Sequence, residues 1–596
     1  MSRFKKALLI SMMVWTVLPS LAREDSLPAL HVEGRHLVNS RGERVIMHGF
    51  AQTFSPWFNE RGSKWNNYND TACLSYNKGI IDKILAAGWQ MTFVRQHMDP
   101  YWSNTPGKNT SGENDISAFD FNRFKTYLDE VFVPMAEYAV GKGLYVVMRP
   151  PGVCPERISV GDDYQKYLLK VWEHVARHPK LKDNLCILYE LANEPIGIYH
   201  ADGTPAGFKE LKEYFQPVVD VIRKHCQNVV LVPGTGWQSQ YAGFADYPIQ
   251  GGNIGYAVHC YPGWYNGGHG DTDVEVTYRD FKRGWDAQIW PVAEFAPVVV
   301  TEMDWAPSKY NSSWGKSNTG IAGGKGFGAN FRRIADETGN VSWLLFTEGH
   351  LLAQYRAAVP NGNTFLTDPE ACPRFCYEWF KYYASQAYKD SINSPDYVQT
   401  REDEPLFSLT DEWFNPCIWE TGTFDETTGQ LQTGTYGFGG WQYPRGADLS
   451  AFHYLVVELK KQQSCGASFR LFDVNNYWDQ PYMADFGSST RKVIDLRNMK
   501  NSNGRKLDPS HIYIAGFWTL GSSPIYISRV FLSDDGSTPS VILTPSFSAN
   551  GVSRRYFTTD GRPLSGPTGG ICIVREQCSD GTIRTFKQIG NKSGNR

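Results

Sequence analysis

Short apolar runs recur through the first two thirds of the chain. The runs are continuous rather than alternating, which is typical of strands buried on both faces of a parallel sheet. We therefore predict eight strands: Val45–Phe50, Met91–Arg95, Leu144–Arg149, Leu185–Ala192, Val229–Val232, Ile254–His259, Val298–Glu302 and Val341–Phe346. A hairpin over residues 31–50 leads into the first of them.

Stretches of helical character separate these runs. They include Ile80–Ala87, Phe121–Val140, Tyr164–Arg177, Phe208–His225 and Phe327–Glu337. Eight strand-then-helix units fit a closed (β/α)8 TIM barrel with loop insertions, an α/β fold. An open, doubly wound sheet is the competing topology. Its glycine fingerprint is missing after the first strand, where the chain reads HGFAQTF.

The pattern changes in the last third of the chain. Residues 390–405 are polar and contain two prolines, so we predict a linker there, after a barrel domain at 23–389. Over 406–537, runs such as YLVVELKK and HIYIAGFW are separated by Gly, Asn, Asp or Ser, which predicts an all-β, jelly-roll-like sandwich. Residues 538–596 read as a small C-terminal β module or sorting-like tail, with Asp-Gly hairpin turns at 560–561 and 580–581.

The N-terminus has the three parts of a secretory signal. Arg3, Lys5 and Lys6 are basic, Ala7 to Leu18 is mainly apolar, and small residues precede a cleavage point after Ala22. The alternative is a single membrane anchor, but the stretch is short for a span of about 20 residues. We therefore predict a signal peptide over residues 1–22 and no membrane span after its removal.

Composition narrows the class of protein. The 596 residues carry a net charge of -3, which argues against a cationic surface for nucleic acid. Aromatic residues make up 14% and suit both cores and platforms for sugar rings. The 11 cysteines are too sparse for a disulfide scaffold. Cys372 with Cys376, and Cys572 with Cys578, are candidate bridges, and most of the others are expected to be buried thiols.

Polar residues gather at the C-terminal ends of the predicted strands, which form the catalytic face of a barrel. They are Arg95, His97, Arg149, Asn193, Glu194, His259, Tyr261, Glu302 and Asp304. Two sequence motifs indicate catalytic residues most clearly. LYELANEP ends in Glu194 and Pro195, and VVVTEMDW contains Glu302. Two carboxylates facing each other across a sugar cleave glycosidic bonds, and at a separation of about 5–5.5 Å one of them attacks directly.

At these residues the chain resembles glycoside hydrolase family 5, the retaining β-glycanases and β-glycosidases built on the (β/α)8 barrel. The resemblance covers roughly residues 31–386. It implies that Glu194 is the general acid/base and Glu302 the nucleophile. It also implies that Asn193 hydrogen-bonds the sugar 2-hydroxyl.

The same resemblance assigns three further residues. Arg95, in FVRQH, matches the second-strand arginine that contacts the nucleophile. His259 and Tyr261, in AVHCYPGW, match the His-x-Tyr of the sixth strand, whose tyrosine orients the nucleophile. No metal and no organic cofactor is implied.

Three departures from the family pattern bear on the substrate. Arg149 stands where the third strand often ends in His, and Phe50 and Ala51 follow Gly49 where Gly-x-Asn is common. Phe346 takes the place of the eighth-strand Trp beneath the sugar, with Trp343 three residues earlier. We count both as candidate substrate contacts and do not assume endo-β-1,4-glucanase activity.

Aromatic residues outside these motifs have two interpretations. Trp264, Trp57 and Trp305 follow presumed strand ends and either stack on sugars or hold loops in place. The sandwich resembles those appended to polysaccharide-degrading enzymes. A stacking platform and a buried core are both open for its aromatic residues, which are Trp441, Tyr443, Tyr477, Trp478, Tyr482 and Trp518.

A possible metal loop, GGHGDTDVE, contains His269, Asp271 and Asp273 but no complete set of ligand spacings, so we predict a solvated loop and no metal site. The favoured function is a secreted, monomeric, retaining glycoside hydrolase acting on plant or microbial β-glycans of the β-glucan or mannan type. We expect it in the periplasm, at the surface or in the medium of a Gram-negative bacterium. The alternatives are an exo-acting glycosidase on short or unusual glycosides and a glycan-binding protein with a degenerate barrel.

Overall fold

The structure is a computed structural model. It describes residues 27–53, 55–59, 62–266, 278–305, 326–346, 351, 372–394, 406–411, 413–450, 452–464, 466–474, 480–521 and 523–537, together with five strands beyond them. The predicted signal peptide, most of the predicted linker and the GGHGDTDVE segment lie outside these residues.

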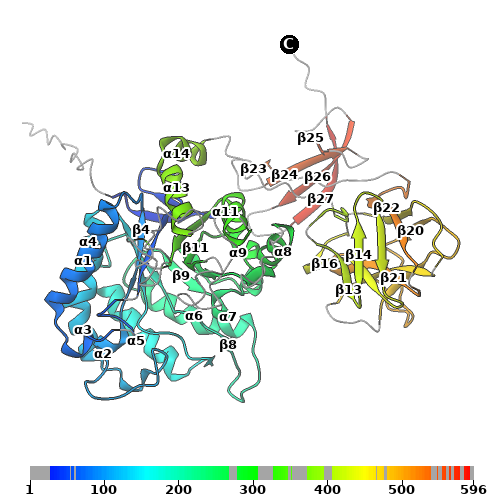
Figure 1. The fold of residues 1–596 in the computed structure, drawn as a ribbon. Coiled ribbons are helices and arrows are strands. Elements are labelled where there is room, and N and C mark those ends of the chain that lie inside the picture. Colours follow the sequence, from blue (N-terminus) through cyan, green and yellow to red (C-terminus); the bar gives the residue numbers. More distant parts are fainter. Residues whose placement is uncertain are drawn as a thin grey trace, which may run out of the picture.

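Eight parallel strands close into a barrel (Figure 1). Their order around the barrel is β10-β11-β12-β3-β4-β5-β7-β9. The strands are β3 (His48–Gln52), β4 (Phe93–His97), β5 (Tyr145–Arg149), β7 (Ile187–Glu190), β9 (Val230–Pro233), β10 (Ile254–Cys260), β11 (Val298–Met303) and β12 (Val341–Leu345). Each overlaps one predicted strand, so the predicted barrel is confirmed. The predicted N-terminal hairpin is also present, as β1 (Leu30–Glu33) and β2 (His36–Asn39).

Helices cover the outside of the barrel. They include α1 (Asp70–Ala86), α3 (Phe121–Tyr127), α4 (Val133–Gly141), α5 (Asp163–Arg177), α6 (Phe208–Arg223), α8 (Tyr278–Gln288), α11 (Gly326–Thr338), α13 (Cys372–Ala384) and α14 (Gln386–Asn393). The helix predicted over 121–140 is interrupted by a π-turn at Leu128–Phe132, next to Pro134. Because proline lacks a backbone N–H, the hydrogen-bond ladder is disrupted at this point.

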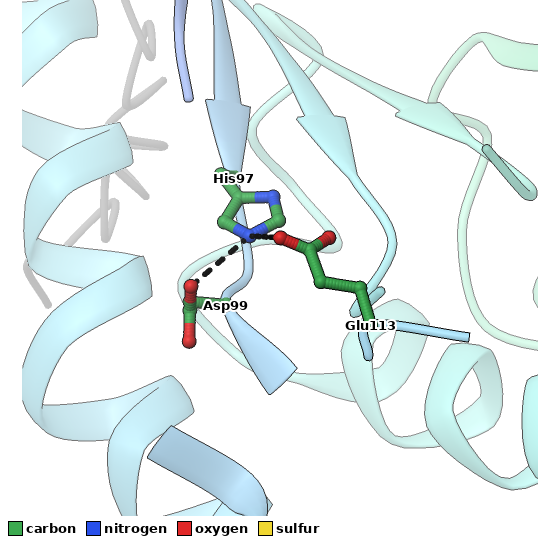
Figure 2. Close-up of side chains that lie close together, drawn as sticks. All are labelled: His97, Asp99 and Glu113. Carbon is green, nitrogen blue, oxygen red and sulfur yellow. Dashed lines mark ion pairs between the residues drawn. The ribbon is translucent and has the colours of Figure 1, made fainter. Parts of the chain in front are cut away.

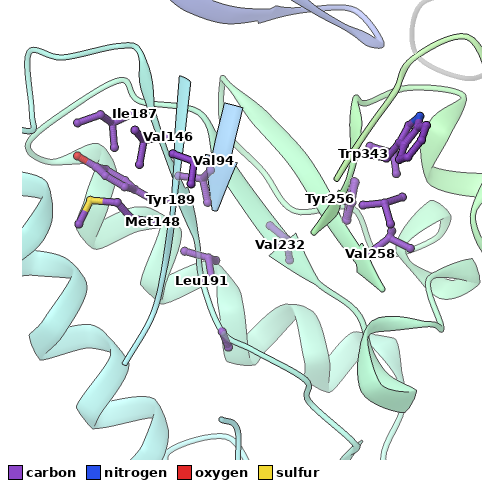
Figure 3. Packing of buried hydrophobic residues seen from close by; sticks show 14 of the residues in the cluster. Val94, Val146, Met148, Ile187, Tyr189, Leu191, Val232, Tyr256, Val258 and Trp343 are labelled. Atoms are coloured by element: carbon purple, nitrogen blue, oxygen red, sulfur yellow. The ribbon is translucent and has the colours of Figure 1, made fainter. Parts of the chain in front are cut away.

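Side chains alternate between two apolar layers. Phe93, Val147 and Leu188 belong to the cluster inside the barrel. Val94, Val146 and other residues of the opposite parity belong to the larger cluster that packs against the helices, part of which Figure 3 shows. This alternation leaves the inward positions at the C-terminal strand ends for polar side chains.

Two five-stranded antiparallel sheets follow the barrel. One contains β13 (Phe414–Trp419), β16 (Phe438–Ala447), β21 (Ile512–Thr519), β18 (Ala467–Phe472) and β19 (Tyr482–Asp485). The other contains β14 (Gly422–Asp425), β15 (Gln430–Thr433), β22 (Ile525–Ser533), β17 (Tyr454–Leu459) and β20 (Arg491–Asp495). Side chains from both sheets form one core, as predicted for a sandwich.

The aromatic platform considered for this sandwich is largely its core. Trp441 and Tyr482 are 0% exposed, and Tyr443 is also buried, so these three pack inside rather than stack on a ligand. Trp518 is partly buried, and Tyr477 and Trp478 lie outside the described residues.

A further antiparallel sheet lies in the predicted C-terminal β module (Figure 1). It consists of β23 (Ser546–Phe547), β24 (Ser553–Thr558), β25 (Pro563–Leu564), β26 (Gly570–Gln577) and β27 (Ile583–Gly590). In the part of the chain that is described, none of the helices is both long and apolar enough to cross a bilayer.

The cysteine predictions have mixed outcomes. Cys376 is a buried free thiol on α13, so the bridge suggested between Cys372 and Cys376 is wrong. The predicted buried thiols are confirmed at five further cysteines, which are Cys73, Cys154, Cys186, Cys226 and Cys260. Cys417 is free but exposed. The pair Cys572 and Cys578 lies outside the side chains that the structure describes.

Candidate active site

Two glutamates meet at the C-terminal mouth of the barrel. Glu194 follows β7, Glu302 lies in β11, and His259 of β10 stands between them. One carboxylate oxygen of each glutamate and a ring nitrogen of His259 all lie within 4.8 Å of one another. His259 Nδ1 is 3.1 Å from Glu194 Oε1 and 3.7 Å from Glu302 Oε2. This short separation suits direct attack by one carboxylate, because inverting enzymes keep their carboxyl groups about 6.5–9.5 Å apart.

Glu302 is held in place by two donors. Arg95 Nη1 donates to Glu302 Oε1, and the hydroxyl of Tyr261 donates to Oε2, both at 2.7 Å. Burial alone raises the pKa of Glu302, but His259, Arg95, Arg149 and the Tyr261 hydrogen bond outweigh it and lower the pKa to about 2. Glu302 is therefore ionised at neutral pH, as a nucleophile requires.

Tyr261 keeps its proton in this arrangement. Burial, followed by the charges of Glu302 and Glu194, raises the pKa of the Tyr261 phenol well above its ordinary value. The hydroxyl is therefore a permanent donor to Glu302.

Glu194 is more open and has an unusual backbone conformation. Its side chain is 25% exposed, and its φ of 57° lies in the left-handed region. This conformation is costly for a residue other than glycine, and such strain is concentrated at functional sites. The backbone N–H of Glu194 donates to Gln238 Oε1 at 2.7 Å, which helps to hold it. The carboxylate thus points into the mouth of the barrel beside Glu302.

Asn193 and His259 complete the inner ring of predicted residues. Asn193 Oδ1 accepts from Arg95 Nη2 at 2.6 Å, so this amide oxygen is fixed beside the glutamates. Together with Arg95 and Tyr261, these residues lie around the two glutamates.

The predicted aromatic contacts divide into two groups. Trp264 is partly buried, with its ring centroid 5.4 Å from that of Tyr261, so it lies at the site. Phe346 faces the barrel interior at the same end. Trp343 is 0% exposed on the outer face of the barrel, where it packs against Phe380 and Phe331, so the prediction that it contacts substrate is wrong.

Trp57 and Trp305 both hold loops in place. The Trp57 backbone carbonyl accepts from the indole N–H of Trp102 at 2.9 Å, and its own ring is buried. Trp305 is 0% exposed and stacks on Trp379 at 6.0 Å. Of the two interpretations for these tryptophans, the structural one holds.

A second polar cluster lies beside the site. Figure 2 shows His97 close to Asp99 and Glu113, with His97 Nε2 at 3.2 Å from Asp99 Oδ2 and 3.7 Å from Glu113 Oε1. All three side chains are buried, as in a metal ligand set. Arg149, at the end of β5, donates to His97 Nδ1 and, at 3.2 Å, to Glu113 Oε2.

The position of Arg149 decides how this cluster is interpreted. Arg149 Nη1 contacts both ring nitrogens of His97, and Nε2 also faces Asp99. The guanidinium supplies the positive charge that the carboxylates need, so the described residues form a closed network rather than an open ligand set. Burial raises the pKa of the Asp99 carboxyl to about 7. Burial, followed by the positive charge of Arg95, lowers the pKa of Arg149 to about 10.

Several residues at the mouth were not predicted. Glu190 is a fully buried carboxylate beneath Arg95, and a charged residue inside the apolar run LYELA was the signal for it. Gln238 and the 50% exposed Trp237 come from a turn with φ values of 62° and 56°. The backbone N–H of Trp237 donates to Pro195 O at 3.0 Å, which places the turn directly after Glu194. Nothing in the sequence showed that contact.

A parallel barrel with glutamates at the ends of its fourth and seventh strands carries the carboxylate pair that glycoside hydrolases use. Residues 56–319, which contain six of the eight barrel strands, match the model of Cellulase (glycosyl hydrolase family 5), and this match identifies a glycoside hydrolase domain.

Curated relatives agree with this family match. The endoglucanase of Bacillus sp. (strain KSM-635) is 27% identical over 240 residues, which is 38% of this chain and 22% of that protein. Endoglucanase A of Butyrivibrio fibrisolvens is 25% identical over 239 residues, or 40% of this chain and 46% of that protein. Endoglucanase E-5 of Thermobifida fusca is 30% identical over 286 residues, which is 46% of this chain and 48% of that protein. The chain thus spans less than half of each relative's length.

The solved structures that are similar to this chain include a β-glucanase from Saccharophagus degradans, which has a TM-score of 0.43 and 16% sequence identity. That match covers 60% of this chain and 95% of the other.

Proposed function

We propose that the chain is a secreted, retaining glycoside hydrolase that cleaves β-linked glycans of the glucan or mannan type by double displacement. The proximity of Glu194 to an ionised Glu302 carries this proposal, because it leaves no space for a water molecule between the nucleophile and the anomeric carbon. The names of the relatives, all endoglucanases, support a β-glucan as the first substrate to test.

In the first step, Glu302 attacks the anomeric carbon while Glu194 gives its proton to the leaving oxygen. The glycosidic bond breaks, and a covalent glycosyl ester forms on Glu302. In the second step, Glu194 takes a proton from water, which attacks the anomeric carbon and releases Glu302.

Neighbouring residues have supporting roles in the proposal. Arg95 and Tyr261 keep Glu302 ionised and aimed, and Asn193 is placed to bind the sugar hydroxyl next to the attacked carbon. His259 contacts both carboxylates, while Trp264 and Phe346 shape the sugar site. Residues 23–389 make up the catalytic domain in this proposal, and the sandwich is an accessory domain.

Mass spectrometry of the products tests the proposal. The chain from Arg23 is incubated with β-glucans, mannans, xylans and xyloglucan, beside Glu302→Ala as control. Defined oligosaccharides released by the wild type alone support it, and their lengths separate endo from exo cleavage. Glycan affinity without release by the wild type would favour a binding protein instead.

A further inference from the structure

Glu190 is a third carboxylate in the barrel, and it does not face the cleft. It is the last residue of β7 and is 0% exposed. Its two oxygens accept four hydrogen bonds, from Arg95 Nε at 2.7 Å, Arg95 Nη2 at 2.8 Å, Gln238 Nε2 at 3.1 Å and Thr301 Oγ1 at 3.1 Å. A buried carboxylate with this many donors is held in one orientation.

One branch of this network leads to Glu302. Glu190 grips Arg95 through Nε and Nη2, which fixes the plane of the guanidinium. Nη1 then points to Glu302 Oε1 at 2.7 Å. Arg95 is fully buried, so bulk water cannot replace either carboxylate. The orientation of Glu190 therefore determines where Arg95 Nη1 lies, and thus the direction from which it donates to Glu302.

A second branch leads to Glu194. Gln238 donates to Glu190 through Nε2 and accepts from the Glu194 backbone N–H through Oε1 at 2.7 Å. This amide lies at the one residue of the pair whose backbone has a positive φ. Gln238 is itself 0% exposed, so its two amide atoms are committed to these contacts and to a 3.3 Å bond with Ala257 O.

We propose that Glu190 is a positioning residue that sets the geometry of both carboxylates at once, through Arg95 for Glu302 and through Gln238 for Glu194. The inference rests on the proposed function, because it assigns roles within that reaction. The competing explanation is a structural ion pair that only neutralises Arg95. A structural pair would change stability, whereas a positioning residue also changes turnover in a way that depends on the leaving group.

Three variants separate these explanations. Glu190→Gln keeps the shape but removes the charge that grips Arg95, and Gln238→Leu cuts only the branch to Glu194. Asp286→Asn is the matched control, since it also removes a buried carboxylate that pairs with a cation, Lys282 at 2.9 Å, on α8 of the same barrel. Rates are measured on 2,4-dinitrophenyl β-cellobioside, which needs no acid, and on cellotetraose, which does.

The expected result is a distinct pattern for each variant. Glu190→Gln lowers kcat about 10- to 100-fold on both substrates, with KM changed less than about twofold, since Glu190 cannot touch the sugar. Gln238→Leu lowers kcat/KM on cellotetraose only, because kcat/KM reports the glycosylation step and only cellotetraose needs the acid in that step. Asp286→Asn lowers the melting temperature and leaves kcat unchanged. Equal kcat for Glu190→Gln and Asp286→Asn, after correction for folded fraction, overturns the proposal.

The proposal can also be tested if Glu190→Gln does not fold or if the wild type is inactive. If Glu190→Gln does not fold, a leaving-group-dependent loss in Gln238→Leu supports the proposal and a uniform or absent loss overturns it. If the wild type hydrolyses nothing, the proposed function has failed independently, and a crystal structure of Glu190→Gln gives the answer. An Arg95–Glu302 contact longer than about 3.5 Å supports positioning, and an unchanged contact refutes it.

Discussion

Removing the Tyr261 hydroxyl gives a direct test of how Glu302 is kept ionised. Tyr261→Phe deletes one oxygen, the donor to Glu302 Oε2 at 2.7 Å, and leaves the ring in place. Because that hydrogen bond favours the charged carboxylate, its loss raises the pKa of Glu302. A protonated Glu302 cannot attack, so activity at low pH falls first.

The size of the effect follows from the site. The pKa of Glu302 lies near 2, well below its ordinary value of 4.5, which corresponds to stabilisation of the charged carboxylate by about 3 kcal/mol. His259, Arg95 and Arg149 share this effect with Tyr261. A hydrogen bond to a charged group contributes about 1.5–3 kcal/mol. We therefore expect the acid limb of kcat/KM to rise by about one pH unit and the plateau to fall about 10-fold.

The assay is kcat/KM for 2,4-dinitrophenyl β-cellobioside between pH 2 and pH 8, in short incubations, so that the range reaches the wild-type pKa of Glu302 near 2. Tyr145→Phe is the control, since it deletes a buried hydroxyl that donates to Pro28 O at 2.8 Å, outside the catalytic pair. It should leave the profile unchanged. An acid limb for Tyr261→Phe that coincides with that of the wild type, with rates within about twofold, would refute this account of the ionised nucleophile.

Three other changes have defined outcomes. Glu194→Ala should abolish hydrolysis of cellotetraose but retain formation of the glycosyl-enzyme from the dinitrophenyl glycoside, seen as a burst; equal loss of both contradicts its acid role. Trp237→Ala should lower kcat/KM for cello-oligosaccharides about fivefold, for loss of about 1 kcal/mol of ring stacking, with the aryl glycoside unaffected; no difference means that the exposed ring does not bind sugar. For Asp99, burial raises the folded pKa to about 7 from 3.8, so the folded state holds a proton that the unfolded chain releases, and stability falls as pH rises between these values. Thermal unfolding of Asp99→Asn should therefore lose less stability than the wild type between pH 5 and pH 8, and parallel curves would exclude this effect.

The barrel could be predicted because its strands are buried on both faces and therefore form continuous apolar runs. Glu302 could be predicted for a related reason, since the end of the run VVVTE marks the C-terminal end of a barrel strand, where the catalytic face lies. The network of Arg149, Glu113 and Asp99 could not be predicted, because Glu113 and Asp99 come from a long loop whose path depends on tertiary contacts. The turn at Trp237 and Gln238 was also hidden, because its left-handed backbone is held by hydrogen bonds to residues around Glu194.

Trp343 and Glu190 show what strand parity adds to such predictions. Side chains of a strand alternate between faces, so Phe346 and Leu344 point into the barrel and Trp343 points out. Trp343 and Phe346 could therefore never both have faced the sugar, and the sequence alone contained this constraint. The same parity places Glu190 on the inward face with Leu188, where a carboxylate in a dry interior needs a cation. Arg95 and Arg149 share that interior, since each lies two residues after an inward anchor, Phe93 and Val147. Counting inward positions therefore limits the cation beside Glu190 to these two arginines, and the structure shows that it is Arg95.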